Sequence, residues 1–250
     1  FVSFDVQALG LIGSHGILPL PEFIDSIKRH FGWERYWLFP MVFWLSSADF
    51  AIQTVCWAGV ALSLLLVFNI LPRLCLLLLY VLYLSLFYAG QDFMTFQWDL
   101  LLLEAGFLAL LLSIAPAIGI WLLRWLLFRF MFLSGAVKLL SGDPTWVNLS
   151  ALSHHFQTQP LPTPLAWYAH QLPQSALLAA TAATFVIELV LPFFIFLPRR
   201  LRFVAAFGFV LLQISIFLTG NYNFFNLLTM ALCLVLFDDA ALYKILPQRL

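Results

Sequence analysis

The feature that most restricts the fold of this chain is a run of 35 residues, Phe203 to Phe237, that contains no Asp, Glu, Lys or Arg. A transmembrane helix needs about 20 mainly apolar residues, and Gly220-Asn221-Tyr222-Asn223 interrupts the run with polar residues. The run therefore predicts two spans joined by a short break. Over the whole chain 10% of the residues are charged and 63% are hydrophobic, whereas soluble proteins are about 25% charged. The sequence predicts an all-α, polytopic transmembrane helix bundle.

The same length criterion predicts about seven full spans in a single transmembrane domain that covers residues 1–250. They are expected near residues 50–72, 74–90, 98–115, 120–139, 175–197, 203–219 and from the Gly220 break to about 239. Residues 1–12 are expected to be the remnant of a further helix. Residues 13–49 are richer in charge, and their I-D-S-I-K-R-H-F pattern predicts an amphipathic helix that lies on the membrane surface.

The basic residues outside the spans predict the orientation of the bundle. The loops at 91–97, 140–175 and 220–226 contain no Lys or Arg. The cations at the other ends of the spans are Arg73, Arg199, Arg200, Arg202, Lys244 and Arg249. Because cytoplasmic loops carry the excess of Lys and Arg, the long 140–175 loop is predicted to be non-cytoplasmic. The net charge of +0 gives no reason to expect a nucleic-acid partner.

Three cations, Arg124, Arg129 and Lys138, lie in one predicted span. Charges at membrane depth are costly and are usually paired. Estimating depth at about 1.5 Å per residue places acids of other helices at matching levels. The expected pairs are Lys138 with Asp99 or Glu104, Arg129 with Glu188, and Arg124 with Asp238 or Asp239. These charges are expected to hold the bundle together; alternatively, Lys138 and Glu104 form a functional polar pocket near the open side.

The loops on the predicted non-cytoplasmic side are expected to form a partner-facing surface. Alternating prolines predict an extended segment, and Trp-Tyr pairs suit either the lipid headgroup level or a partner protein. The expected surface residues are Trp146, His154, His155, Pro160, Pro162, Pro164, Trp167, Tyr168, His170, Asn221, Tyr222 and Asn223. Asn221, Asn223 and Asn226, with Tyr222, could satisfy a broken helix end or bind a ligand.

No metal or cofactor is expected. His154 and His155 are adjacent, so they lack the one-turn spacing of a helical metal site. Cys56, Cys75 and Cys233 fall inside apolar runs and form no C-x-x-C, so they are predicted to be buried apolar residues. Nucleophile-elbow, zinc-protease and phosphate-loop motifs are also absent from the sequence, so no soluble-type active site is expected.

Four long segments closely resemble the lipase maturation factor family: F-Q-W-D-L-L-L-E-A-G-F-L-A (96–108), W-L-L-R-W-L-L-F-R-F-M-F-L-S-G-A-V-K-L-L-S-G-D-P-T-W (121–146), T-Q-P-L-P-T-P-L-A-W-Y-A-H-Q-L-P (158–173) and T-G-N-Y-N-F-F-N-L-L-T (219–229). The resemblance implies a membrane protein of the animal endoplasmic reticulum, with bacterial relatives, that assists folding and assembly of secreted lipases. It also implies a further C-terminal domain, so the chain is expected to be a fragment.

Two departures bear on these expectations. The family pattern Y-H-Y-E-T-Q corresponds here to residues 154–159, where Gln157 replaces the acid. The Arg-over-Lys, Leu/Ala-rich composition favours a bacterial inner membrane, or the endoplasmic reticulum membrane if the source is eukaryotic.

The segment S-G-A-V-K-L-L also resembles, over a shorter stretch, a helix of the vitamin K-dependent gamma-carboxylase group that carries a reactive lysine. That resemblance implies an alternative, an intramembrane enzyme with Lys138 as base and Glu104 or His155 assisting, acting on a lipophilic cofactor or substrate. The main expectation is a non-catalytic chaperone whose partners are the lipid bilayer and a secreted, lipase-like client.

Overall fold

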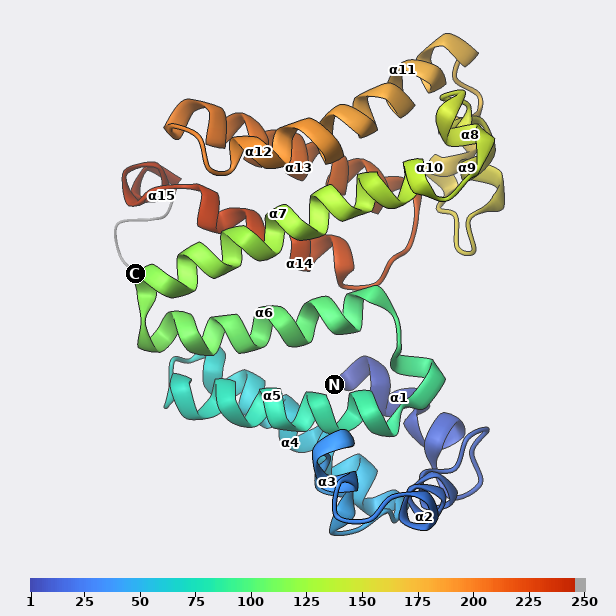
Figure 1. The fold of residues 1–250 in the computed structure, drawn as a ribbon, viewed down its shortest axis with the longest axis vertical. Coiled ribbons are helices and arrows are strands. Elements are labelled where there is room, and N and C mark those ends of the chain that lie inside the picture. The colour runs from blue at the N-terminus through green and yellow to red at the C-terminus, as the bar shows by residue number, and fades with distance from the viewer. Residues whose placement is uncertain (246–250) are drawn as a thin grey trace. The chain divides into compact units, whose positions relative to one another are not determined.

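The computed structural model describes residues 1–245, so Arg249, one of the predicted cytoplasmic cations, lies outside the described part. The named elements of this part are all helical, as predicted (Figure 1). The chain divides after Gly119 into two compact units, and each is described by itself.

Unit 1 contains three long helices and several short ones. Its elements are α1 (Val2–Ile12), α2 (Leu20–His30), α3 (Arg35–Leu38), η1 (Val42–Trp44), α4 (Asp49–Val67), α5 (Pro72–Ala89), η2 (Gln91–Met94) and α6 (Gln97–Ile114). Helix α7 (Pro116–Leu140) begins at the end of unit 1 and runs through unit 2.

Unit 2 continues with three short helices and then the remaining long ones. Its elements after α7 are α8 (Pro144–Val147), α9 (Ala151–Thr158), α10 (Pro164–His170), α11 (Gln174–Phe185), η3 (Val186–Val190), α12 (Leu191–Phe194), α13 (Arg199–Thr219), α14 (Phe225–Leu232), η4 (Cys233–Leu236) and α15 (Asp239–Ile245).

Six helices of the described part are long and apolar enough to cross a membrane. They are Asp49–Val67, Pro72–Ala89, Gln97–Ile114, Pro116–Leu140, Gln174–Phe194 and Arg199–Thr219. The seventh predicted span is shorter than expected, because the apolar helix there covers only Phe225–Leu236 and its last turn is a 3-10 helix. The integral membrane character is therefore supported, with six full-length spans rather than seven.

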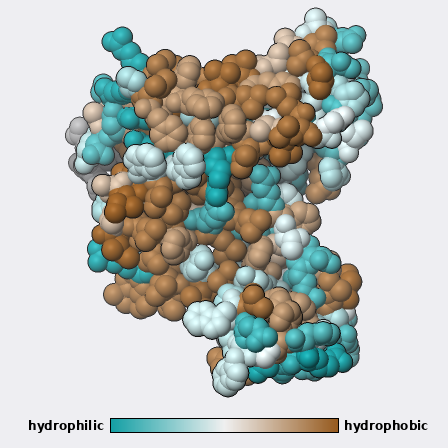
Figure 2. Space-filling view, viewed as in Figure 1, coloured by the Kyte–Doolittle hydropathy of each residue, from teal (hydrophilic) through white to brown (hydrophobic). Residues whose placement is uncertain are grey.

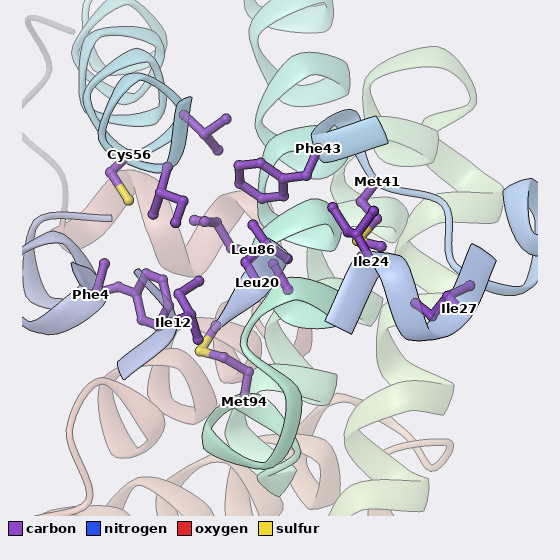
Figure 3. Close-up of a cluster of buried hydrophobic side chains, with 14 residues drawn as sticks. Phe4, Ile12, Leu20, Ile24, Ile27, Met41, Phe43, Cys56, Leu86 and Met94 are labelled. Atoms are coloured by element: carbon purple, nitrogen blue, oxygen red, sulfur yellow. The ribbon is translucent and has the colours of Figure 1, made fainter. Parts of the chain in front are cut away.

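The amphipathic segment of unit 1 packs against the unit's own core. Helix α2 starts with a proline in its first turn and ends with Lys28, Arg29 and His30, as the helix dipole favours. Its apolar side buries Leu20, Ile24 and Ile27 in a cluster with α1, α4 and α5 (Figure 3). The predicted location of residues 13–49 at the membrane surface stays a prediction, although the neighbouring indoles of Trp33 and Trp37 are 83% and 88% exposed.

The cysteines are buried as predicted. Cys56, Cys75 and Cys233 are all free thiols inside apolar surroundings. They behave as small apolar residues of the two cores.

In unit 2 the connector, defined here as residues 141–173, gathers α8, α9 and α10 at one end of the long helices (Figure 1). Helix α9 packs on α11, and α10 packs on α13. The surface is hydrophobic over the long helices and more hydrophilic at the α8–α10 end (Figure 2). The segment with alternating prolines, predicted to be extended, is non-helical from residue 159 to residue 163, and the connector around it is largely helical.

The connector and the arginine-rich turn lie at opposite ends of one span. Thr163 of the connector donates from its backbone N–H to the carbonyl of Thr219, at the last residue of α13. Arg199 is the first residue of the same helix, and 21 residues of α-helix are about 31 Å long. This confirms the predicted separation, while the identity of the cytoplasmic side stays a prediction.

Replacing Ile24 tests the packing of α2. Because Ile24 is 3% exposed, Ile24→Ala should leave a cavity and lower the free energy of unfolding by about 2–5 kcal/mol. Lys28→Ala on the exposed side of the same helix is the matched control and should change it by less than about 0.5 kcal/mol. Denaturant unfolding in lipid nanodiscs, followed by tryptophan fluorescence, measures both. Equal effects of the two substitutions would contradict the packing.

Candidate functional site

The central polar contact of unit 2 is an ion pair between Lys138 and Glu188. The ammonium Nζ of Lys138 lies 2.6 Å from both Oε1 and Oε2 of Glu188 and 3.2 Å from the carbonyl oxygen of Ser134. The two side chains are 22% and 6% exposed. Nζ also lies 5.4 Å from the ring centroid of Trp146, within the range of a cation–π contact. The pair therefore joins α7 to η3 and to the first helix of the connector.

The local sequence explains why Glu188 can reach this position. Pro192 has no N–H to donate to the carbonyl of Glu188, and its ring would clash with that carbonyl in a regular α-helix. The helix widens just before it, and η3 is π-helical over Val186–Val190. Such single-turn π segments often occur at functional sites. Here the wider turn carries the buried carboxylate.

Gly135 allows α7 to approach η3 closely. A Cβ atom at Gly135 would lie 2.8 Å from the Cγ of Leu189 and 2.9 Å from the Cβ of Glu188. These distances are shorter than normal carbon–carbon contacts. The absence of a side chain at this position therefore brings the two backbones together one turn away from Lys138.

The predicted partners of Lys138 and Glu188 were wrong. The sequence predicted Lys138 opposite Asp99 or Glu104, and Glu188 opposite Arg129. The depth estimate assumed that α7 and α11 reach the membrane surface at the same level. The contact between Gly135 and Glu188 shows instead that the two helices are staggered along their length.

Three other charges were predicted to lie within the membrane. Asp99 and Glu104 belong to unit 1, and Arg129 belongs to unit 2. Asp99 is buried in unit 1, where Tyr83 donates its hydroxyl to Oδ1 of Asp99 at 2.7 Å. Glu104 lies on α6 and Arg129 on α7. A tyrosine hydroxyl thus satisfies one oxygen of the carboxyl group for which a cation was predicted.

Arg124 was predicted to pair with Asp238 or Asp239, and the structure gives it a different partner. Its Nε donates to the carbonyl oxygen of Val235 at 2.9 Å, and Nε of Arg202 donates to that of Leu236 at 2.7 Å. The last carbonyls of a helix have no intrahelical partner, so the guanidinium groups complete the end of η4. Asp238 instead forms an ion pair with Arg199, with Nε and Oδ2 2.5 Å apart.

A second set of contacts, the clasp, fastens residues 159–163 of the connector to residues 218–221 at the end of α13. Gln159 donates from Nε2 to the carbonyl of Thr219 at 2.8 Å, and Pro162 and Gly220 form an isolated antiparallel bridge. The N–H of Asn221 donates to the carbonyl of Leu161 at 3.2 Å. A Cβ at Gly220 would lie 2.5 Å from Oε1 of Gln159. The proline segment is therefore held in place at the end of a span.

In the break after α13, a side chain of the loop accepts a hydrogen bond from one of the loop's own backbone N–H groups. Oδ1 of Asn221 accepts from the N–H of Asn223 at 3.3 Å, and Asn223 has a positive φ of 55°. These contacts support helix-end satisfaction, one of the two roles that the sequence left open for this loop.

The sequence analysis missed a buried polar contact next to this break. The fully buried Asn226 donates from Nδ2 to Oε1 of Gln213 at 2.7 Å, between α14 and α13. Two amides on successive apolar segments could have indicated it, because an isolated amide is costly inside a membrane.

The predicted partner-facing residues divide into exposed and inward-turned groups. The exposed ones are His154, Pro160, Pro162, Pro164, Trp167, Tyr168, Asn221 and Asn223. Trp146, His155, His170 and Tyr222 are partly buried. Trp146 packs edge-to-face on Phe185, and His170 contacts the amide of Gln157. These two side chains contribute to the fold of the connector.

His155 lies close to the ion pair and is electrostatically affected by it. Burial lowers the pKa of His155 below its ordinary value, and the positive charge of Lys138 lowers that pKa further. Both effects disfavour the imidazolium form. Within residues 1–245 no group of three or more His, Cys, Asp or Glu side chains is placed to hold a metal ion.

Comparison with known proteins identifies relatives over nearly the whole chain. Residues 1–244 match a family model described as the lipase maturation factor transmembrane domain. The chain is 46% identical to lipase maturation factor 2 of Xenopus laevis over 260 residues, which cover 96% of this chain and 37% of that protein. Identity to the Homo sapiens protein of the same name is 42%, covering 96% and 38% of the two chains.

Lipase maturation factor 1 of Mus musculus is 34% identical, covering 99% of this chain and 47% of its own length. The chain thus spans less than half the length of these curated relatives. All three are vertebrate proteins, so they do not support the expected bacterial source. No solved structure matches the chain.

Breaking the ion pair should destabilise unit 2. Lys138→Met or Glu188→Leu leaves one buried charge without its partner, so each should lower the free energy of unfolding by about 3–5 kcal/mol. The double variant removes both charges and should recover most of that loss. The exposed pair Lys28 and Asp25 is the matched control, because truncating either residue should cost at most about 1 kcal/mol. Additive losses in the double variant of Lys138 and Glu188 would contradict the pairing.

Adding one carbon at Gly135 should force α7 and η3 apart. Gly135→Ala should lower the free energy of unfolding by about 1–3 kcal/mol through overpacking. The control is Gly106→Ala in α6, where an added Cβ has no atom within 4 Å. That variant should stabilise its helix by up to about 1 kcal/mol. Denaturant unfolding of both variants in nanodiscs measures the difference, and stabilisation by Gly135→Ala would contradict the close approach.

The lowered pKa of His155 predicts a pH dependence. As pH falls below about 6.5, an unfolded histidine binds a proton before the folded one does, so stability should decrease until the folded pKa is reached. His155→Gln should reduce this decrease, and the exposed neighbour substitution His154→Gln is the control. Melting temperatures between about pH 8 and pH 5 would measure it. The expectation is wrong if the two variants have the same pH profile.

Proposed function

Because the chain belongs to the lipase maturation factor family, we propose that it forms the membrane-embedded part of a maturation factor that assists folding or assembly of secreted lipase-like proteins. The proposed location is the endoplasmic reticulum membrane, with the connector on the non-cytoplasmic side. The loops without Lys or Arg support that orientation. In this proposal the protein acts as a chaperone through its surface.

The observation that carries the proposal is a firmly held connector that has no charged side chain beyond its first residues. No Asp, Glu, Lys or Arg occurs between Pro144 and Ile187. The segment is nevertheless folded into α8–α10. It is held at one point by the contact of Trp146 with the Lys138 ammonium and at another by the clasp. An incompletely folded client exposes apolar surface and unpaired amides. A surface without fixed charges imposes no ion-pair geometry on such a client, so it suits clients without a unique docking geometry.

The surroundings of Lys138 favour the structural role over the enzymatic alternative. A lysine that acts as a base needs a free lone pair directed at its substrate. The Nζ atom here is surrounded by two carboxylate oxygens, one backbone carbonyl and an indole face. These contacts bind an ammonium group, which favours a structural role for Lys138.

One variant separates the two functions in the full-length protein. The double substitution Lys138→Met with Glu188→Leu removes the amine but replaces the pair with apolar side chains of similar size. Under the proposal, secreted lipase activity should follow the amount of folded maturation factor and stay near the unsubstituted level. Under the enzymatic alternative, activity should be lost although the protein is folded. Lys138→Met alone is the control and should lose both folded protein and activity.

Photo-crosslinking tests the client surface directly. A photoreactive amino acid at the exposed positions His154 or Asn221 of the full-length protein should crosslink to a newly made lipase in secreting cells. Phe207 in α13 is 68% exposed on a membrane-spanning helix and is the control position, where lipid should compete with protein. Absence of lipase adducts at both connector positions would contradict the proposal.

A further inference from the structure

We propose that α10 and the turn after it form a membrane-surface anchor whose exposed side chains, Leu165, Trp167, Tyr168 and Leu172, insert into the boundary between headgroups and acyl chains of the surrounding bilayer. The inference rests on the placement of α10 between two membrane-spanning helices. It does not depend on the identity of the client proposed above.

Both ends of α10 are tied to the ends of spans. Before its first residue, Thr163 donates its backbone N–H to the carbonyl of Thr219, 3.2 Å away at the end of α13. After its last residue, residues 171–173 lead directly into α11, which begins the span Gln174–Phe194. A helix of 7 residues is about 10 Å long. The helix therefore stays near the level at which the two spans leave the membrane.

The exposed side of α10 has the composition of a membrane-interface segment. Ala166 is fully buried beneath it, whereas Trp167 and Tyr168 are 63% and 66% exposed, and Leu165 and Leu172 are 48% and 51% exposed. The rings of Trp167 and Tyr168 pack edge-to-face with centroids 5.1 Å apart. Trp and Tyr are enriched at membrane–water interfaces because each has an apolar ring and a polar tip.

The polar tips of the two aromatic side chains are available for headgroups. Among the hydrogen bonds of residues 1–245, none involves Nε1 of Trp167 or the hydroxyl of Tyr168. The segment from Pro144 to Ile187 has no charged side chain, so inserting it desolvates no ionic group. Facing water, the same four side chains would leave their apolar area hydrated, which is unfavourable.

Insertion of the α10 side chains into the bilayer would also restrict which part of the connector can contact a client. If Trp167 and Tyr168 are in lipid, the part of the connector region left to face water and the client excludes them. The polar and proline residues exposed there include His154, Pro160, Asn221 and Asn223. The anchor would then fix the height of this surface above the membrane.

Site-directed spin labelling of the full-length protein in phosphatidylcholine vesicles tests the anchor. Labels at Trp167→Cys and Tyr168→Cys are compared with two reference positions. Leu211→Cys, 63% exposed within α13, reports the acyl-chain region, and the exposed His154→Cys reports water. The native cysteines are buried, and labelled unsubstituted protein gives the background. The readouts are collision rates with oxygen, which is enriched in lipid, and with a water-soluble nickel chelate.

The expected result is an oxygen-to-nickel collision ratio at 167 and 168 that is severalfold above the ratio at 154 and below that at 211. Phosphatidylcholine with a nitroxide near the headgroup end of its chain should also broaden the spectra of labels at 167 and 168. A ratio equal to that at 154 would overturn the proposal, because the face would be in water. Low collision rates with both reagents would also overturn it, because the face would be covered by protein, either a second copy or a partner.

The measurement needs no client, so its outcome is separable from that of the proposed function. Lipase crosslinks at position 154, together with collision ratios at position 167 that match those of the water reference, would support the client surface and reject the anchor. Collision ratios at position 167 well above the water reference, without lipase crosslinks at position 154 or 221, would support the anchor and reject the client surface.

Discussion

The arrangement of unit 2 depends on the requirement that a positive charge in an apolar bundle be neutralised. Lys138 meets this requirement through Glu188, and an isolated charge at that depth would be costly. The pair fixes the register of α7 against η3, since Gly135 and Glu188 are in contact one turn away. The ring of Trp146 lies over the same ammonium group. The position of α8 in the connector therefore also depends on the ion pair. One ion pair thus links two spans and the segment proposed to face the client.

Other polar groups of unit 2 follow the same rule with different partners. Arg124 and Arg202 donate to the carbonyls of Val235 and Leu236, and Asn226 donates to Gln213. The clasp uses backbone groups freed where α13 ends. Because water is not available inside a bilayer, helix ends and amides must find partners within the protein. The polar contacts therefore concentrate at the two ends of the spans and at the π-helical turn.

The alternating prolines predicted an extended segment, and residues 159–163 are non-helical between α9 and α10. Pro164 occupies the first turn of α10, where a missing N–H is harmless. Pro162 pairs with Gly220 outside any helix. The prolines thus mark where the connector bends and where a short helix starts. This gives the connector a defined surface, which a chaperone role without a nucleotide cycle would use.

The sequence by itself determined the helical membrane fold, the family, the buried cysteines and the opposite locations of the connector and the arginine turn. These follow from the length of apolar runs, from long motifs and from the distribution of Lys and Arg, all of which are local properties of the chain. It also identified Lys138, Glu188 and Arg124 as charges that need partners. Only the tertiary structure decided which partners they have. The choice depends on the stagger between helices, on the close approach at Gly135 and on the wider turn before Pro192, and these are set by packing between segments about 50 residues apart, as the Lys138–Glu188 bond shows.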